Sequence, residues 1–325
     1  MKRREFLSKS TLLGGAVLLP WKPTLSIGKN SEKLRVGLIA DLHNDIMHDG
    51  QDRLSAFLKT ATSNKSDFIM QMGDFCVPKE QNEKLIQLWN TYQNPSYHIL
   101  GNHDTDGGFI RKQTMKFWGM ESRYYSFDSH GYHFVILDGN DPNPKPWSGY
   151  HRYIDQDQQN WLKQDLEKTK LHAFVFSHQT LENEEGGVAN FTEIRRILEE
   201  ANKNAGETKV VACFSGHHHT DYMTDINGIY YIQINSASYR WVGDDYQHVR
   251  YSKEIDEAYP WIKYTIPYKD PLFTFLDIDP VGELRIKARS TEFVGPGPKE
   301  MGMPKRPEND PILPKISGFQ FIFDG

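Results

Sequence analysis

From residue 34 onward the chain alternates between short apolar runs and longer amphipathic stretches, and this rhythm limits the possible folds more than any other feature. "LRVGLIADLH" (34–43) and "DFIMQMGD" (67–74) are typical of buried strands, whereas "QDRLSAFLKTAT" (51–62) between them has the apolar spacing of a helix. The pattern recurs in "YHILGNHD" (97–104), "HAFVFSHQ" (172–179) and "KVVACFSG" (209–216). Alternation of this kind predicts an α/β layered fold.

Two hairpin signals interrupt the alternation. "RYYSFDSHGYHFVILDG" (123–139) holds Ser129-His130-Gly131 between two apolar runs, and "YMTDINGIYYIQI" (222–234) holds Asn227-Gly228. Turn residues of this type between apolar runs are typical of antiparallel hairpins. A mixture of strand–helix–strand units and hairpins predicts two mixed sheets rather than one doubly wound sheet.

The length of 325 residues allows one large domain with additions, and we place this domain at residues 34–291. Inside it, residues 239–270 form an aromatic insert, since eight of the thirty residues from Tyr239 to Tyr268 are Tyr or Trp. Residues 292–325 hold six of the 17 prolines. We expect them to form an irregular C-terminal tail that packs over the domain through its last aromatic residues.

Charge and cysteine content argue against three classes of protein. The formal net charge of −5 argues against nucleic acid as a structural partner, because binding a phosphate backbone needs a basic face. Cys76 and Cys213 lie in or beside apolar runs, and two cysteines support neither a disulfide framework nor a thiolate zinc site. The sequence does not indicate an oligomeric state.

Residues 1–30 are expected to be an export signal that is removed. They combine a basic start, an apolar run too short to cross a bilayer and a polar stretch. Arg3-Arg4 followed by "EFL" resembles a twin-arginine signal and implies the twin-arginine export machinery, with a general secretory signal as the alternative. Nothing later resembles a membrane span, so we expect a soluble periplasmic or extracellular protein.

Five short polar motifs lie at the carboxyl ends of predicted strands, where open α/β sheets bind ligands. They are "DLH" (Asp41, His43), "GD" (Gly73, Asp74), "GNHD" (Gly101 to Asp104), "SH" (His178) and "GHHH" (His217, His219). Aspartate, histidine and asparagine without a thiolate suit zinc, iron or manganese. The seven candidate ligands exceed what one tetrahedral ion needs. They fit two ions that share a carboxylate, an arrangement that catalyses in-line displacement at phosphorus.

Three consecutive histidines, His217, His218 and His219, follow the apolar run 209–214. If the chain stays extended just past the strand, successive side chains point to opposite sides. His217 and His219 would then face one way as ligands, with His218 as a bystander.

The five motifs, taken in order, resemble those of the calcineurin-like metallophosphoesterases, and the resemblance covers residues 34–291. It implies a four-layer αββα sandwich with the site at the carboxyl ends of the strands. It also implies two metal sites that share a bridging aspartate: Asp41, His43 and His219 at the first, Asn102, His178 and His217 at the second, and Asp74 between them.

The same resemblance gives His103 a place facing the substrate, oriented by Asp104. Alternatively, Asp104 caps the start of a helix and His103 has no role at the site. The purple acid phosphatases resemble the set but carry a tyrosine three residues after the "GD" aspartate, where this chain has Val77, and they lack the histidine of "DLH". The chain therefore resembles the phosphodiesterase-like branch more than the purple enzymes.

The function implied is hydrolysis of a phosphoric ester, with a diester favoured. Two divalent or trivalent ions (manganese, iron or zinc) would generate hydroxide for attack on phosphorus, and His103 would protonate the leaving alkoxide. A phosphomonoesterase and a non-catalytic metal-binding protein stay open as alternatives. We expect Asn102 and His103 to contact the substrate. Tyr239 and Trp241 either line the mouth of the site or serve packing.

Overall fold

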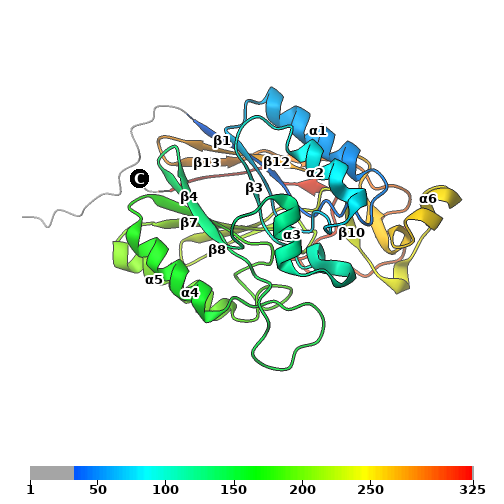
Figure 1. The fold of residues 1–325 in the computed structure, drawn as a ribbon. Helices are drawn as coiled ribbons and strands as arrows, with labels where there is room; N and C mark the ends of the chain where they lie inside the picture. Colours follow the sequence, from blue (N-terminus) through cyan, green and yellow to red (C-terminus); the bar gives the residue numbers. More distant parts are fainter. Residues whose placement is uncertain (1–32, 324–325) are drawn as a thin grey trace, which may run out of the picture.

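The computed structural model describes residues 33–323, so the expected export signal at residues 1–30 lies outside the described part of the chain (Figure 1). The longer helices are α1 (Gly50–Ser63), α2 (Glu83–Trp89), α3 (Arg111–Trp118), α4 (Gln156–Lys168), α5 (Phe191–Ala205) and α6 (Lys253–Ala258). Among these described residues, no helix has the length and apolar character needed to cross a bilayer.

Two mixed six-stranded sheets form the centre of the molecule. The first sheet has the order β16 (Phe319–Ile322), β13 (Glu283–Ile286), β12 (Thr274–Asp279), β1 (Leu34–Ile39), β2 (Phe68–Gln71) and β3 (Ser96–His98). The second has the order β4 (Tyr125–Ser129), β5 (Tyr132–Ile136), β6 (His172–Phe176), β7 (Val210–Ser215), β9 (Ile229–Gln233) and β8 (Tyr222–Ile226). Strands β1, β2 and β3 are parallel, as are β5, β6, β7 and β9, so their carboxyl ends share one edge in each sheet.

Both expected hairpins are confirmed. Strands β4 and β5 pair antiparallel around His130-Gly131, and β8 and β9 pair antiparallel around Asn227-Gly228. All four turn residues have positive φ, which matches the twist of a tight two-residue hairpin.

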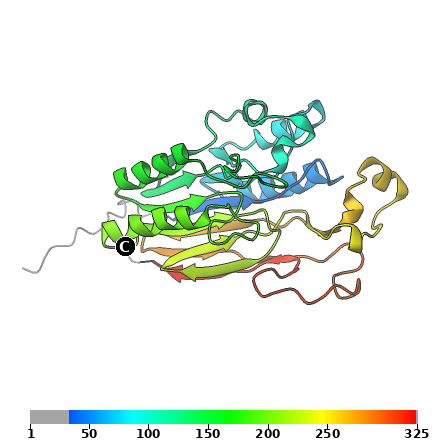
Figure 2. The ribbon, with the colours of Figure 1, turned by 90° about the horizontal axis from the view of Figure 1, so that it is seen from below.

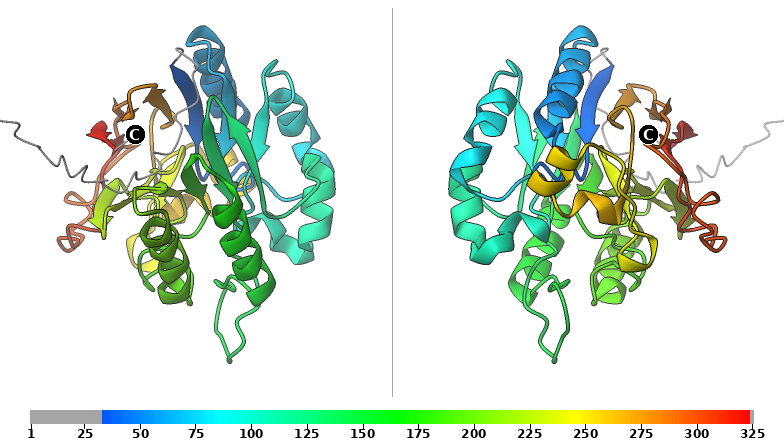
Figure 3. Two further views of the ribbon diagram at one scale, coloured as in Figure 1. Left: turned by 90° about the vertical axis from the view of Figure 1, so that its left-hand side faces the viewer. Right: turned by 90° about the vertical axis from the view of Figure 1, so that its right-hand side faces the viewer.

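The layers follow the order helix, sheet, sheet, helix, which confirms the predicted αββα sandwich. Helices α1, α2 and α3 cover the first sheet, and α4 and α5 cover the second (Figure 3). Helix α1 buries Leu54, Phe57, Leu58 and Ala61, the spacing of one helix face. Strands β6 and β7 are buried at every position because both faces of their sheet are covered.

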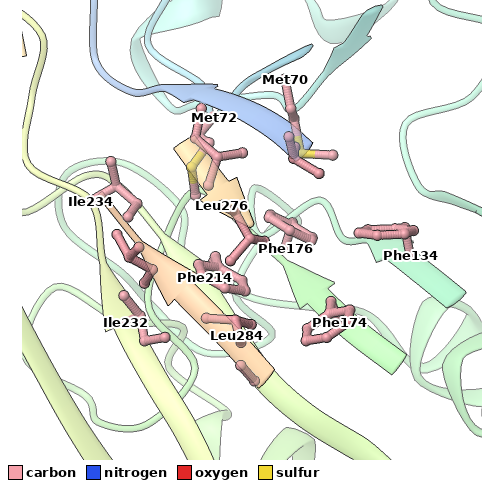
Figure 4. Packing of buried hydrophobic residues seen from close by; sticks show 14 of the residues in the cluster. Met70, Met72, Phe134, Phe174, Phe176, Phe214, Ile232, Ile234, Leu276 and Leu284 are labelled. Atoms are coloured by element: carbon pink, nitrogen blue, oxygen red, sulfur yellow. The ribbon is translucent and has the colours of Figure 1, made fainter. Parts of the chain in front are cut away.

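The main core lies between the two sheets. Figure 4 shows Met70 and Leu276 from the first sheet and Phe134, Phe174 and Phe214 from the second pointing into a shared apolar layer. This packing fixes the two sheets relative to one another and therefore the strand ends that carry the polar motifs.

The aromatic insert and the tail both contain regular structure. The insert holds α6 and a two-stranded sheet of β10 (Tyr239–Trp241) and β11 (Thr265–Pro267), and it lies at the end of the molecule opposite the C-terminus (Figure 2). The expectation of an irregular tail is wrong in part. Strand β15 (Lys315–Ile316) pairs with β14 (Arg289–Ser290), and β16 is an edge strand beside β13. Its last aromatic residues, Phe321 and Phe323, are buried in the main core.

Candidate metal centre

The five polar motifs meet at one end of the sandwich because each follows a parallel strand. Backbone hydrogen bonds continue the sheets past the strand ends: Asp41 N donates to Gly73 O at 3.1 Å, and Gly216 N donates to His178 O at 3.0 Å. Between the sheets, His217 N donates to the carboxylate of Asp41 at 3.1 Å. The folded sheets thus bring together residues that lie up to 178 positions apart in the sequence, from Asp41 to His219.

The described residues form two ligand clusters, one of Asp41, His43 and His219 and one of Asp74, His178 and His217. Within each cluster the possible ligand atoms lie within 4.8 Å of one another. Asp74 Oδ2 is 3.1 Å from His178 Nε2 in its own cluster and 3.6 Å from His43 Nε2 in the other. Asp74 therefore lies between the clusters, where a bridging carboxylate is needed.

The donor chemistry fits cations. Asn102 is only 4% exposed, and its Oδ1 atom is buried without a hydrogen-bond partner. A buried amide oxygen without a donor is unfavourable, and a cation satisfies it. Asn102 thus has the property expected of the seventh ligand, and oxygen and imidazole donors are the set that zinc, iron and manganese accept.

Outer hydrogen bonds orient two of the imidazoles. His178 Nδ1 is 2.8 Å from Met72 O, and His219 Nδ1 is 2.7 Å from Tyr239 O. Donation from Nδ1 to a carbonyl turns the other ring nitrogen, Nε2, toward the cluster, as in most metal-binding histidines. His219 Nε2 lies 3.1 Å from His43 Nε2, so two nitrogens converge on one point.

Burial and neighbouring charges set the protonation of the cluster. Burial, followed by the neighbouring histidines, lowers the pKa of His217 well below its ordinary value, and burial does the same to His43. At His178 burial again lowers the pKa, but Asp74 outweighs it and raises the pKa to about 10. For Asp74 burial raises the pKa, and His178 and His103 outweigh it and hold the pKa well below its usual range. Asp74 is therefore ionised and able to attract cations.

The three consecutive histidines differ in their relation to the two ligand clusters. His217 and His219 fall in different clusters, and His218 belongs to neither. The backbone is not extended there: φ is 67° at His217 and 51° at His219. Asp41, His43 and Asp74 share this left-handed conformation, which costs non-glycine residues about 1–3 kcal/mol each. Backbone strain of this kind is common at functional sites, and no sequence pattern predicts it.

The expected role of Asp104 is corrected by the structure. Its buried carboxylate makes no hydrogen bond to the ring of His103; it accepts hydrogen bonds from the backbone N–H groups of Asp74, Phe75, Cys76 and Gly101 at 2.7–3.2 Å. Asp104 therefore ties the loop after β2 to the loop after β3.

Asp106 orients His103 instead. His103 Nδ1 lies 2.7 Å from Asp106 Oδ2, and the hydroxyl of Tyr150 lies 3.1 Å from the same nitrogen while donating to Asp106 Oδ1 at 2.8 Å. Burial lowers the pKa of His103, but Asp74 and Asp106 outweigh it and raise the pKa to about 9. The spacing His103-x-x-Asp106 was a usable signal, because residues three apart share one side of a helical turn. Nothing in the sequence pointed to Tyr150.

A cleft of about 950 Å³ opens over the clusters. It is lined by His103 and by both predicted wall residues: Tyr239, buried with its ring 5.0 Å from that of His43, and Trp241, which is 44% exposed. Trp261 of the aromatic insert also lines the cleft, as do Phe109 and Tyr150, which no sequence pattern indicates. Val77, where purple acid phosphatases have tyrosine, lies in the same wall.

The chain is similar in sequence or in fold to known proteins. The family model for calcineurin-like phosphoesterases matches residues 34–221. A dimetal phosphatase from Danio rerio has a similar structure, with a TM-score of 0.56 and 14% identity over 80% of this chain and 98% of that chain. GAP50, the anchor in the inner membrane complex of Plasmodium, has a TM-score of 0.49 and 14% identity over 90% of this chain and 89% of that one. No curated protein matches in sequence.

Likeness at 14% identity establishes the fold alone, whereas the family model covers more than half of the chain and includes all seven candidate ligands. The two buried clusters supply the donors that this family's chemistry needs. The chain therefore belongs to the calcineurin-like phosphoesterase family and is a metal-dependent phosphoesterase.

Proposed function

We propose that the protein is a phosphodiesterase in which His103 is the general acid. The observation that carries this proposal is the position of His103: its ring lines the cleft, 5.3 Å from the ring of His43, while Asp106 holds its Nδ1 atom. With Nδ1 engaged, Nε2 is the nitrogen left to give a proton to a leaving group.

Two ions held by the seven ligands would supply Lewis-acid activation of water and of the phosphoryl oxygens. Asp41, His43 and His219 would hold one ion, Asn102, His178 and His217 the other, and Asp74 would contact both. The chain itself contributes the fixed spacing of the two clusters and the proton at His103. In a non-catalytic metal-binding protein, the contact between His103 and Asp106 would have no function.

The charge of the cleft favours a diester over a monoester. Its lysine and its arginine are both paired, Lys79 Nζ with Asp45 Oδ1 at 2.6 Å and Arg240 Nη1 with Asp310 Oδ1 at 2.7 Å, and His103 is paired with Asp106. A monoester dianion gains more from free cations than a diester, which has one negative charge. The rings of Phe109, Trp241 and Trp261 offer apolar contact to ester groups.

The test compares bis(p-nitrophenyl) phosphate with p-nitrophenyl phosphate on protein loaded with manganese, zinc or iron. We expect a higher kcat/KM for the diester. A higher kcat/KM for the monoester would establish the phosphomonoesterase alternative. Protein that holds two ions and turns over neither ester would be the non-catalytic binding protein.

We also propose that the protein is exported by the twin-arginine route, on the strength of Arg3-Arg4 and the apolar run that follows. Replacing both arginines by lysine keeps the charge of the segment. Cell fractionation should then find the variant retained in the cytoplasm. Unchanged export would instead favour the general secretory route.

A further inference from the structure

We infer that a second pocket beside the metal centre binds a neutral, hydroxylated group of the substrate. This inference refines the proposed function and rests on it. The pocket has a volume of about 260 Å³ and shares His217, His218 and Arg240 with the cleft. Its other walls come from the loop after β6, the end of β9 and the C-terminal tail. An ester arm on a phosphorus held at the metals would therefore have this pocket beside it.

Two residues that line the pocket carry buried amide oxygens without partners. Gln233 is 2% exposed, and its Nε2 atom donates to Glu182 Oε1 at 3.0 Å. Asn183 Nδ2 donates to the same carboxylate oxygen at 3.2 Å. A carboxylate accepts hydrogen bonds, so it fixes both amides with nitrogen toward Glu182. Gln233 Oε1 and Asn183 Oδ1 are left as buried acceptors without a donor in the described structure.

His218 adds a third buried polar atom. Its Nε2 has no hydrogen-bond partner among the described residues, and its ring packs against Gly186. A Cβ atom at position 186 would overlap the imidazole, so the glycine leaves the space that His218 occupies. The histidine that takes part in neither metal cluster thus has a place in this pocket.

The charges of the pocket balance. Arg240 and Arg306 both pair with Asp310, and Glu185 supplies a second negative charge. Burying an uncompensated charge is costly, so neither a second phosphate nor an amine fits a pocket whose own charges cancel. Hydroxyl groups donate and accept, and therefore match two amide oxygens and an imidazole nitrogen. The volume is below that of typical drug-sized pockets, about 300–1,000 Å³, which favours a small group such as glycerol or a pentose.

The experiment uses three diesters with the same p-nitrophenyl leaving group and a different second arm: glyceryl, propyl or 3-aminopropyl. The full metal-loaded protein should prefer the glyceryl ester to the propyl ester by about tenfold in kcat/KM, since each hydrogen bond to an otherwise unsatisfied group contributes modestly. Asn183→Leu should bring this ratio close to unity. Glu184→Leu, in the same loop but outside the pocket, is the matched control and should keep the ratio.

Titration calorimetry with glycerol 3-phosphate and propyl phosphate provides a readout without turnover. Tighter binding of glycerol 3-phosphate than of propyl phosphate, with the difference lost in Asn183→Leu, would support the pocket. If the protein also hydrolysed no ester, the proposed function would be rejected but the pocket would stand. Equal kcat/KM for glyceryl and propyl esters would overturn the pocket and leave the phosphodiesterase intact. Preference for the aminopropyl ester would also overturn it, in favour of a cation site.

Discussion

His103 Nδ1 lies 2.7 Å from Asp106 Oδ2, and this contact fixes which ring nitrogen is free to act on a substrate. Asp106→Asn should weaken general-acid catalysis, which is typically worth about 10²–10⁴-fold. An alkoxide needs the proton far more than a nitrophenolate does. We therefore expect turnover of a dialkyl phosphate to fall much more than that of bis(p-nitrophenyl) phosphate.

His103→Ala should give the same contrast more strongly, with both ions still bound because His103 is not a ligand. Elemental analysis and rates on the two esters check both points. Equal losses on both esters would assign Asp106 and His103 to binding of the phosphoryl group. Loss of an ion would place His103 among the ligands.

Asp104 should matter for stability rather than for proton transfer. Asp104→Ala leaves four backbone N–H groups without their acceptor, and each buried unsatisfied donor costs about 1–3 kcal/mol. We expect a marked loss in the free energy of unfolding, measured by urea denaturation. The neighbouring Thr105→Ala is a control that keeps the Asp104 carboxylate. A stable Asp104→Ala variant with a selective loss on alkyl esters would restore the role first expected for this residue.

The histidines 217–219 should separate in metal binding. His217→Ala and His219→Ala each remove a donor from a different cluster, so each should weaken one ion. His218→Ala removes no donor from either cluster and should leave the metal content unchanged. Elemental analysis of the three variants is sufficient, and equal metal loss in all three would contradict the assignment.

His133 lies outside the metal centre and should make the free energy of unfolding depend on pH. Its Nδ1 lies 2.6 Å from Asp128 Oδ1 and its Nε2 lies 2.8 Å from Asp165 Oδ2, so the ring is held as the cation. Burial lowers the pKa of His133, but these hydrogen bonds outweigh it and raise the pKa above its ordinary value. The stabilisation is then complete below the unfolded-state pKa of about 6.5 and is lost as the pH rises through the folded-state pKa.

His133→Gln should therefore cost most stability on the acidic side of neutrality and progressively less in alkaline buffer. Urea unfolding of both proteins across this range measures the difference. A cost that does not change with pH would mean that the ring serves packing alone.

The sequence was sufficient for the layers because they depend on local patterns, and the same patterns predict the ligand set, which metal analysis has to test. Apolar runs ending in Asp or His, such as the one before Asp41, mark strand ends, and parallel strands place those ends together. The two clusters and the unpartnered Asn102 Oδ1 agree with that reasoning.

The rest depends on contacts between distant segments. Tyr150 reaches His103 from a loop 47 residues away, and the tail brings Arg306 and Asp310 beside His218. The backbone at His217 is left-handed rather than extended, which strand alternation does not predict. Asp106 is the exception, because its three-residue spacing from His103 is visible in the sequence.

If two ions share Asp74, the metal stoichiometry of Asp74→Asn should differ from that of the wild type. The change keeps the size of the side chain but removes the negative charge between the clusters, where Asp74 Oδ2 lies 3.1 Å from His178 Nε2 and 3.6 Å from His43 Nε2. Elemental analysis of metal-loaded protein should find two ions per chain in the wild type and at most one in the variant, with near-complete loss of diester turnover. An Asp74→Asn protein that holds two ions and hydrolyses the diester at the wild-type rate would contradict the account.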